Sequence, residues 1–443
     1  MRATTRPGSS TPMNIILASL GDFLHGIGAA FSLFGSVWYF VLPPLLYPIF
    51  KILWMDHIQG RYAASFQFVL LEIIPPKEIE KSPQLMESIY SGLAGVLKGY
   101  NVVEEFILGH FPASFSLEMV SRGGAVHFYI RTQKGFRNLV EAHFYAQYPD
   151  MEISEVPDYV DDVPRTLPNS DWDLWGTDFD LVKPDLYPIK TYRFFEEDVT
   201  GKMIDPIAGL IEALGRLGPD QNMWFQMIIA PEKDAWYKKG QGMVDDFLGK
   251  EKKESTNFLA KVWADIADIL ANIIPGMFGA AAFSAGEVKE QKQEQPLEFR
   301  LSPGQKDVLK ALESNLGKQM FRTKMRLLYV GRRTGFDKTN ISMFMGALKQ
   351  FNDQNLNGFK PNDNSKTYAN YIFVNERLRF RQRRIFRRYL NRDPSPGDKM
   401  FELSTEELAT LFHMPDMSVM APAFTRVAAK RATAPSNLPI LEE

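Results

Sequence analysis

The side chains best suited to binding chemistry are concentrated in residues 376–392, which hold eight arginines against one glutamate. On a helix, at about 100° per residue, the apolar side chains of this segment share one arc. They are Leu378, Ile385, Phe386 and Tyr389. A second arc carries five arginines, Arg377, Arg381, Arg384, Arg388 and Arg392. Closely spaced guanidiniums repel one another, so we predict that this row binds a polyanion: nucleic-acid phosphates, lipid headgroups or an acidic protein surface.

The chain itself offers another partner for this row. Residues 150–180 hold ten carboxylates against one arginine, whereas the whole chain has a formal net charge of only −2. This balance excludes a generally basic nucleic-acid coat but allows a local basic site. Pairing between the acidic segment and the arginine row inside the fold is therefore the alternative to an external polyanion.

The residue patterns of common enzyme classes are missing from the sequence. There are no cysteines, which excludes thiol nucleophiles and thiolate metal sites. The closest approach to a phosphate-binding loop, GRRTGFDKTN at residues 331–340, lacks the Gly-Lys pair, and the six histidines show no metal-ligand spacing. The sequence thus predicts no catalytic residue, no metal site and no cofactor, and favours a non-enzymatic protein.

An uncharged run of 25 residues, 26–50, follows an N-terminal tail at residues 1–25. Because roughly 20 apolar residues cross a bilayer core, we expect a transmembrane helix over 26–55. A signal peptide or a buried helix is the alternative. Lys51 and Arg61 follow the run, which predicts a single-pass protein of the cell membrane with most of the chain in the cytoplasm. The expected aromatic membrane anchors are Trp38, Tyr39, Tyr47 and Trp54.

Residues 60–157 show the pattern of a ferredoxin-like α+β domain. Apolar strands and helical apolar spacing alternate in the order β-α-β-β-α-β, with Gly123–Gly124 marking a hairpin between the two central strands. The expected strands lie at 65–75, on both sides of the glycine pair, and at 151–156; the expected helices lie at 82–100 and 134–147.

A second α+β domain is predicted over residues 178–400. It contains strands at 179–193, 222–230 and 322–331 and helices at 205–217 and 338–352, with a last strand near 370–374. An insertion at residues 232–300 interrupts it. Residues 401–443 are expected to form a short helix with a capping box at Ser404–Glu407, followed by an extended tail.

Five segments resemble an uncharacterised domain found in proteins of candidate-phylum bacteria. They are VHFYIRT (126–132), LVEAHFYAQYPDMEI (139–153), DLYPIKTY (185–192), DPIAGLIEAL (205–214) and LSTEELATLFHMP (403–415). In that family the domain precedes or neighbours hexameric ATPases similar to type IV secretion coupling proteins, of the FtsK and HerA class. Where the two are fused, the ATPase core follows a segment like 403–439, whereas this sequence ends at Glu443.

The resemblance implies an accessory role beside a motor. We expect a membrane-anchored, non-enzymatic scaffold subunit of a type IV secretion-like apparatus for DNA or protein, docking an ATPase on a separate chain. Its expected partners are the membrane, that ATPase and nucleic acid contacted through phosphates; a homo-oligomer is also compatible with the sequence. The alternative is a general membrane-attached scaffold whose arginine-rich helix binds anionic lipid or an acidic protein.

Overall fold

The computed structural model describes residues 46–76, 82–195, 204–232, 235–247, 301–392 and 400–416, with isolated positions between 35 and 44. The chain divides into two compact units. The first comprises residues 1–66 and 99–111, and the second comprises residues 67–98 and 112–443.

The described part of the first unit has two helical segments. Residues 46–64 are helical, and α3 (Val102–Phe106) begins with a capping box between Asn101 and Glu104. The indole nitrogen of Trp54 donates a hydrogen bond to the carbonyl oxygen of Phe106 at 2.8 Å, and Tyr62 stacks on His110. These contacts join the two segments.

The prediction of a transmembrane helix over residues 26–55 is wrong, and so is the single-pass location that depended on it. Among the residues that the structure describes, no helix has the length and apolar character to cross a membrane. The helix at 46–64 carries Lys51, Asp56 and Arg61, which interrupt the roughly 20-residue apolar run that a bilayer core requires.

The predicted membrane anchors divide between described and undescribed positions. Trp38 and residues 1–34 lie outside the described residues. Tyr39, Tyr47 and Trp54 are exposed, and Trp54 uses its indole nitrogen within the unit, on Phe106.

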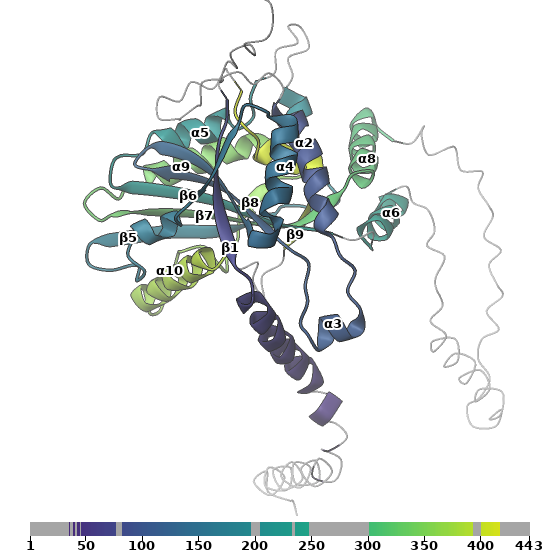
Figure 1. Cartoon of the computed structure of the whole chain (residues 1–443), viewed down its shortest axis with the longest axis horizontal. Helices are drawn as coiled ribbons and strands as arrows, with labels where there is room; N and C mark the ends of the chain where they lie inside the picture. Colours follow the sequence, from purple (N-terminus) through teal and green to yellow (C-terminus); the bar gives the residue numbers. More distant parts are fainter. Residues whose placement is uncertain are drawn as a thin grey trace, which may run out of the picture. The chain divides into compact units, whose positions relative to one another are not determined.

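The second unit is built on one nine-stranded antiparallel sheet (Figure 1). Eight strands lie in the order β4-β1-β3-β2-β6-β7-β5-β8, and β9 pairs with β7. The strands are β1 (Phe68–Ile74), β2 (Phe115–Arg122), β3 (Ala125–Gln133), β4 (Glu152–Val156), β5 (Trp172–Leu181), β6 (Gln221–Pro231), β7 (Met320–Arg332), β8 (Phe359–Pro361) and β9 (Phe401–Ser404). The main helices are α2 (Ser82–Leu93), α4 (Arg137–Gln147), α5 (Ala208–Gly215), α6 (Ala235–Phe247), α8 (Pro303–Leu316), α9 (Thr339–Leu348), α10 (Val374–Leu390) and α11 (Thr405–Leu411).

The two expected α+β units share this sheet instead of forming separate domains. The elements β1, α2, β2, β3, α4 and β4 follow the β-α-β-β-α-β order, and β5, α5, β6, β7, α9 and β8 repeat it. The strand orders 4-1-3-2 and 6-7-5-8 are mirror arrangements that meet where β2 pairs with β6 along eight residues, Phe115–Arg122. Two split βαβ units therefore join edge to edge.

Both faces of the sheet are covered, and successive side chains along its strands point alternately to the two buried faces. Phe225 and its neighbours at every second position pack in the large core beneath α2, α4, α5, α9 and α11. Trp224 points to the opposite face, where Tyr159, Ile385 and Tyr389 cover it from the 157–171 connection and α10. Alternation of this kind is typical of antiparallel strands buried on both sides.

Strand boundaries of the second half differ from the predictions at two places, while the predicted turn of the first half is found where expected. The Gly123–Gly124 hairpin is confirmed, and Gly124 has a φ of +92° with the carbonyl oxygens of Leu217 and Gly215 only 2.8 and 3.0 Å from where a Cβ would lie. The first strand of the second half begins and ends earlier than expected, since β5 covers Trp172–Leu181 and not 179–193. The last strand of the second half is β8 at 359–361, whereas residues 371–373 form a turn and α10 begins at Val374. Residues 248–300 and 417–443 lie outside the described residues.

The predicted capping box of α11 is confirmed and buries a carboxylate. Glu407 accepts hydrogen bonds from the backbone N–H groups of Ser404 (2.8 Å) and Ile189 (3.0 Å). Burial raises the pKa of Glu407 to about 7, although these backbone hydrogen bonds oppose the shift.

This raised pKa predicts a pH dependence of stability. Below about pH 4.5 the group is protonated in both the folded and the unfolded chain, and between about 4.5 and 7 only the unfolded chain ionises. Ionisation should therefore lower the free energy of unfolding by roughly 3 kcal/mol as pH rises through this window. Urea unfolding of the wild type and Glu407→Gln at pH 5 and pH 8 measures the effect. The wild type should lose clearly more stability than the variant; equal losses would contradict the assignment.

Candidate functional site

The arginine-rich segment forms α10, and its apolar arc lies against the sheet as the spacing predicts. Ile385, Phe386 and Tyr389 are buried beside Trp224 and Leu328 on the sheet face that α10 covers. Glu376 lies in the first helical turn and Arg387 and Arg388 in the last, which suits the helix dipole. This packing fixes the rotation of α10 about its own axis, so each arginine lies on a definite side of the helix.

A row of polar side chains crosses the sheet beneath α10. Glu118 of β2 lies opposite Gln226 of β6, Gln226 lies opposite Arg326 of β7, and Arg326 lies opposite Asp178 of β5. All four side chains are fully buried. Buried charges are tolerated only when they are paired and hydrogen-bonded. The stability of the fold therefore depends on the cations that contact Glu118 and Asp178.

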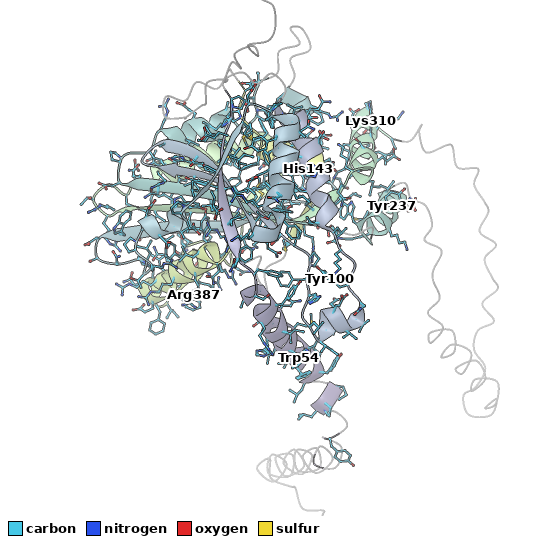
Figure 2. All side chains as sticks on the ribbon, viewed as in Figure 1. Trp54, Tyr100, His143, Tyr237, Lys310 and Arg387 are labelled. Atoms are coloured by element: carbon cyan, nitrogen blue, oxygen red, sulfur yellow. The ribbon has the colours of Figure 1, made fainter. Side chains whose placement is uncertain are left out.

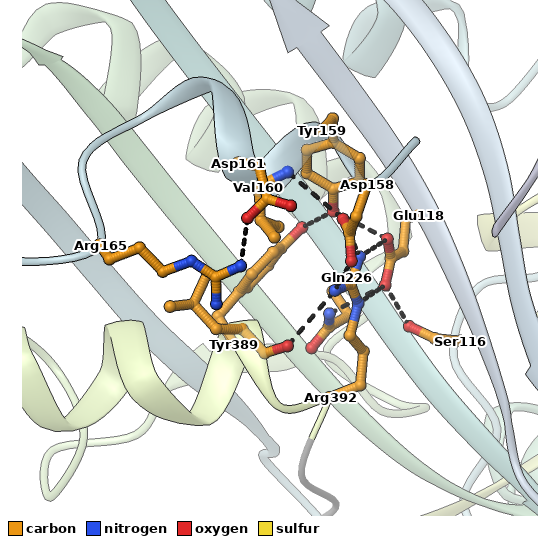
Figure 3. Close-up of polar contacts among 11 residues, drawn as sticks. Ser116, Glu118, Asp158, Tyr159, Val160, Asp161, Arg165, Gln226, Tyr389 and Arg392 are labelled. Carbon is orange, nitrogen blue, oxygen red and sulfur yellow. Dashed lines mark hydrogen bonds and ion pairs between the residues drawn. The ribbon is translucent and has the colours of Figure 1, made fainter. Parts of the chain in front are cut away.

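Arg392, just beyond the end of α10, meets the first of these carboxylates (Figure 3). Its Nε and Nη2 donate to the two oxygens of Glu118 at 3.0 and 3.1 Å, a bidentate ion pair. Its Nη1 and Nη2 also donate to Asp158 at 2.5 and 2.8 Å. Arg392 has a positive φ of 47° and is only 5% exposed. The guanidinium thus joins β2 to the connection that follows β4.

Three neutral side chains complete the environment of Glu118. Ser116, Gln226 and Tyr159 donate to its carboxylate at 2.5, 3.0 and 2.8 Å, and the Tyr389 hydroxyl lies 2.7 Å from that of Tyr159. Burial would raise the pKa of Glu118, but the charge and hydrogen bonds of Arg392 lower it below its usual value. Burial raises the pKa of both tyrosines. Glu118 is therefore an ionised, fully buried carboxylate held by charged and neutral donors.

Asp178 is the second buried carboxylate and gathers cations from two elements. Arg326 Nε donates to its Oδ1 at 2.7 Å, and Lys324 and Arg388 approach its Oδ2 at 3.9 Å. Arg326 also donates to the carbonyl oxygen of Arg388 at 3.0 Å. The C-terminal half of α10 is therefore attached to β5 and β7 by charge as well as by apolar packing.

The five arginines predicted to bind a polyanion have two different roles inside the fold. Arg388 and Arg392 contact Asp178 and Asp158, two carboxylates of the acidic segment 150–180, as the internal-pairing alternative expected. The other three donate to backbone carbonyl oxygens of the loop before α10: Arg377 to Asn370, Arg381 to Asp363, Lys366 and Tyr368, and Arg384 to Asn364. Their role in binding a polyanion stays a prediction.

A different set of arginines faces outward. Arg379, Arg383 and Arg387, which we call the outer arginines, are exposed at positions four residues apart, and Arg387 lies at the surface of α10 in Figure 2. Among the described residues, no ion pair or hydrogen bond is seen for their guanidiniums. Spacing predicts that the apolar arc faces the sheet, but it does not show which of the remaining arginines find partners inside the fold.

Metal ligands are not grouped anywhere in the described part of the chain, where no cluster of three or more His, Asp or Glu side chains could hold an ion.

A family model for a domain of unknown function, DUF8128, matches residues 64–426. The chain belongs to this family. The DUF8128 match extends over the whole sheet, α10 and α11, and it includes the Glu118 and Asp178 clusters as well as the outer arginines. Membership confirms the resemblance to an uncharacterised domain. A search of curated proteins finds no match to the chain.

Proposed function

We propose that this protein is a non-enzymatic accessory or scaffold subunit of a type IV secretion-like apparatus for DNA or protein, and that it presents α10 to a polyanionic partner. In this proposal an ATPase of the FtsK and HerA class acts on a separate chain and docks on the scaffold. The resemblance of residues 126–132, 139–153 and 403–415 to domains that neighbour such ATPases supports the context.

The observation that carries the proposal is the division of the α10 arginines. Those on the inner side contact buried carboxylates or the preceding loop, so they hold the helix in place. The outer arginines remain on a rigidly held surface. Three guanidiniums on one exposed side bind an anion with several charges more strongly than an anion with one charge. Each additional ion pair that forms releases counterions into solution.

Charge reversal of the outer arginines tests this surface. The variant Arg379→Glu/Arg383→Glu/Arg387→Glu should bind heparin, a soluble polyanion, about 100-fold more weakly than the wild type at low salt, because three counterion-releasing contacts are lost. Its thermal unfolding should match that of the wild type, since the three side chains are exposed. Affinity chromatography with a salt gradient measures the difference.

A matched control makes the same change of charge elsewhere. Lys306 and Lys310 of α8 and Lys349 beyond α9 are also exposed. The variant Lys306→Glu/Lys310→Glu/Lys349→Glu should keep most of the heparin affinity. Equal losses in the two variants would show that net charge alone is responsible and would contradict a site on α10. Hydrolysis of ATP by the purified chain alone would contradict the non-enzymatic assignment.

A further inference from the structure

The turn before α10 and the first residue of the helix, which together we call the 371–374 turn, expose four apolar residues in succession. Tyr371, Ile372, Phe373 and Val374 are 91%, 69%, 72% and 37% exposed, and Phe380 on the following turn of α10 is 64% exposed. Single exposed apolar side chains are common on proteins, but a contiguous group marks an interaction site. The 371–374 turn and the outer arginines belong to the same helix and its entry, so they form one candidate surface.

The backbone of the turn is strained, and burial of its own side chains does not compensate for the cost. Tyr371 and Phe373 have φ angles of +71° and +50°, in the left-handed region that bulky residues rarely adopt. Each such residue costs on the order of 1 kcal/mol or more. Because both rings are exposed, their burial does not compensate for this cost. Strain of this kind at exposed positions points to a functional role for the side chains.

Arginines of α10 hold the turn in this conformation. Arg377 Nη1 donates to the carbonyl oxygen of Asn370 at 3.0 Å, and Arg381 Nη1 donates to those of Lys366 and Tyr368 at 3.1 and 2.7 Å. The 371–374 turn thus lies between α10 and a loop that these hydrogen bonds attach to α10 before any partner binds. Preorganisation reduces the entropy lost on binding.

The charges beside the turn identify the chemistry of the partner. The outer arginines extend from Arg379 to Arg387, about 12 Å along the helix at 1.5 Å per residue. Glu376, at the start of the same arc, is the exposed carboxylate among them. The surface therefore combines a net positive strip with aliphatic and aromatic side chains at one end.

We propose that this surface binds the headgroup region of an anionic lipid bilayer, with the 371–374 turn entering the interface and the outer arginines contacting lipid phosphates. A bilayer interface accepts aliphatic and aromatic side chains together, and its anionic headgroups attract arginines. Single-stranded nucleic acid also binds arginines and aromatic rings, but Ile372 and Val374 have no flat face on which a base stacks. The inference rests on the proposed function, since it names the polyanion that α10 would meet.

Flotation of the full chain with vesicles tests the inference. The wild type should float with vesicles of phosphatidylcholine and phosphatidylglycerol and much less with phosphatidylcholine alone. Reversal of the outer arginines should weaken binding about 100-fold, as expected for the loss of three basic residues at an anionic surface. The variant Ile372→Ser/Phe373→Asn should weaken it at least about tenfold through the lost apolar insertion.

The turn variant also separates a binding role from a structural one. Asparagine adopts positive φ more readily than phenylalanine, so Ile372→Ser/Phe373→Asn should keep or raise the unfolding temperature. A lowered unfolding temperature would assign the turn a structural role and overturn the inference. Val182→Ser/Tyr145→Asn, which removes two exposed apolar side chains elsewhere, should leave vesicle binding unchanged.

The remaining outcomes are equally decisive. Equal binding to vesicles with and without phosphatidylglycerol, or unchanged binding by the turn variant, overturns the inference. A wild type that binds heparin and a single-stranded oligonucleotide but no vesicles also overturns it, and leaves the proposed function standing with nucleic acid as the partner. Failure to bind heparin as well as vesicles contradicts both.

Discussion

Replacing Arg392 with methionine is expected to lower the free energy of unfolding by about 3–5 kcal/mol, as is typical when one partner of a buried ion pair is removed. The change leaves the fully buried Glu118 without its bidentate guanidinium and removes the link to Asp158. Methionine fills much of the arginine volume, so the loss measures charge more than packing. Urea denaturation followed by circular dichroism gives the value.

The controls for this change lie on the same helix and in the same cluster. Arg387→Met removes an exposed outer arginine and should change stability by less than about 0.5 kcal/mol. The double variant Arg392→Met/Glu118→Gln should be less destabilised than the sum of its two single changes, because the uncharged amide no longer needs a cation. Strict additivity would show that Arg392 and Glu118 do not act as a pair.

Asp178→Asn is expected to have an effect of the same size, about 3–5 kcal/mol. The substitution keeps the shape of the side chain but deprives the fully buried Arg326 of its ion-pair partner at 2.7 Å and removes the negative charge near Lys324. Thermal unfolding gives the loss. Hydrogen exchange should also show reduced protection in α10, since Arg388 lies near the same carboxylate.

Asp171→Asn provides the matched comparison for Asp178→Asn. Asp171 lies one residue before β5 and is exposed, so the same loss of charge there should cost less than about 0.5 kcal/mol. If the two asparagine variants were equally stable, the cluster around Asp178 would not contribute to the stability of the fold.

Local patterns were sufficient to predict most helices and strands of the second unit. Alternating and helical apolar spacing located β1, α2, β6 and α9, and the capping box at Ser404–Glu407 fixed the start of α11. The joining of both halves into one sheet could not be predicted in this way. It depends on the pairing of β2 with β6, two strands about 100 residues apart whose runs are buried on both faces.

Apolar composition was the least reliable guide to environment. The run YIFV at 371–374 resembles a strand, yet its side chains are exposed in a turn and at the first residue of α10. The uncharged run 26–50 indicated a membrane helix, but no helix of the described residues could span a membrane, and the helix at 46–64 carries Lys51 and Asp56. Composition shows that a segment is apolar, but the residues packed against it in the fold determine whether it is buried.

The location of the site and the buried face of α10 were predictable, but the partners of its arginines were not. The sequence identified α10 and its apolar arc, and it identified the acidic segment that supplies Asp158 and Asp178. It could not identify Glu118, which lies in a buried strand 274 residues from Arg392. Without that partner, the arginines that stabilise the fold could not be separated from those that remain exposed.

The salt concentration at which heparin releases the two sets of α10 variants tests the central claim most directly. The claim is that Arg377, Arg381 and Arg384 hold the fold while Arg379, Arg383 and Arg387 bind the partner. We expect glutamine at the three outer positions to lower the elution salt strongly with unchanged unfolding. Glutamine at the other three should lower stability and leave the elution salt of the folded protein near that of the wild type. The reverse pattern would contradict the account.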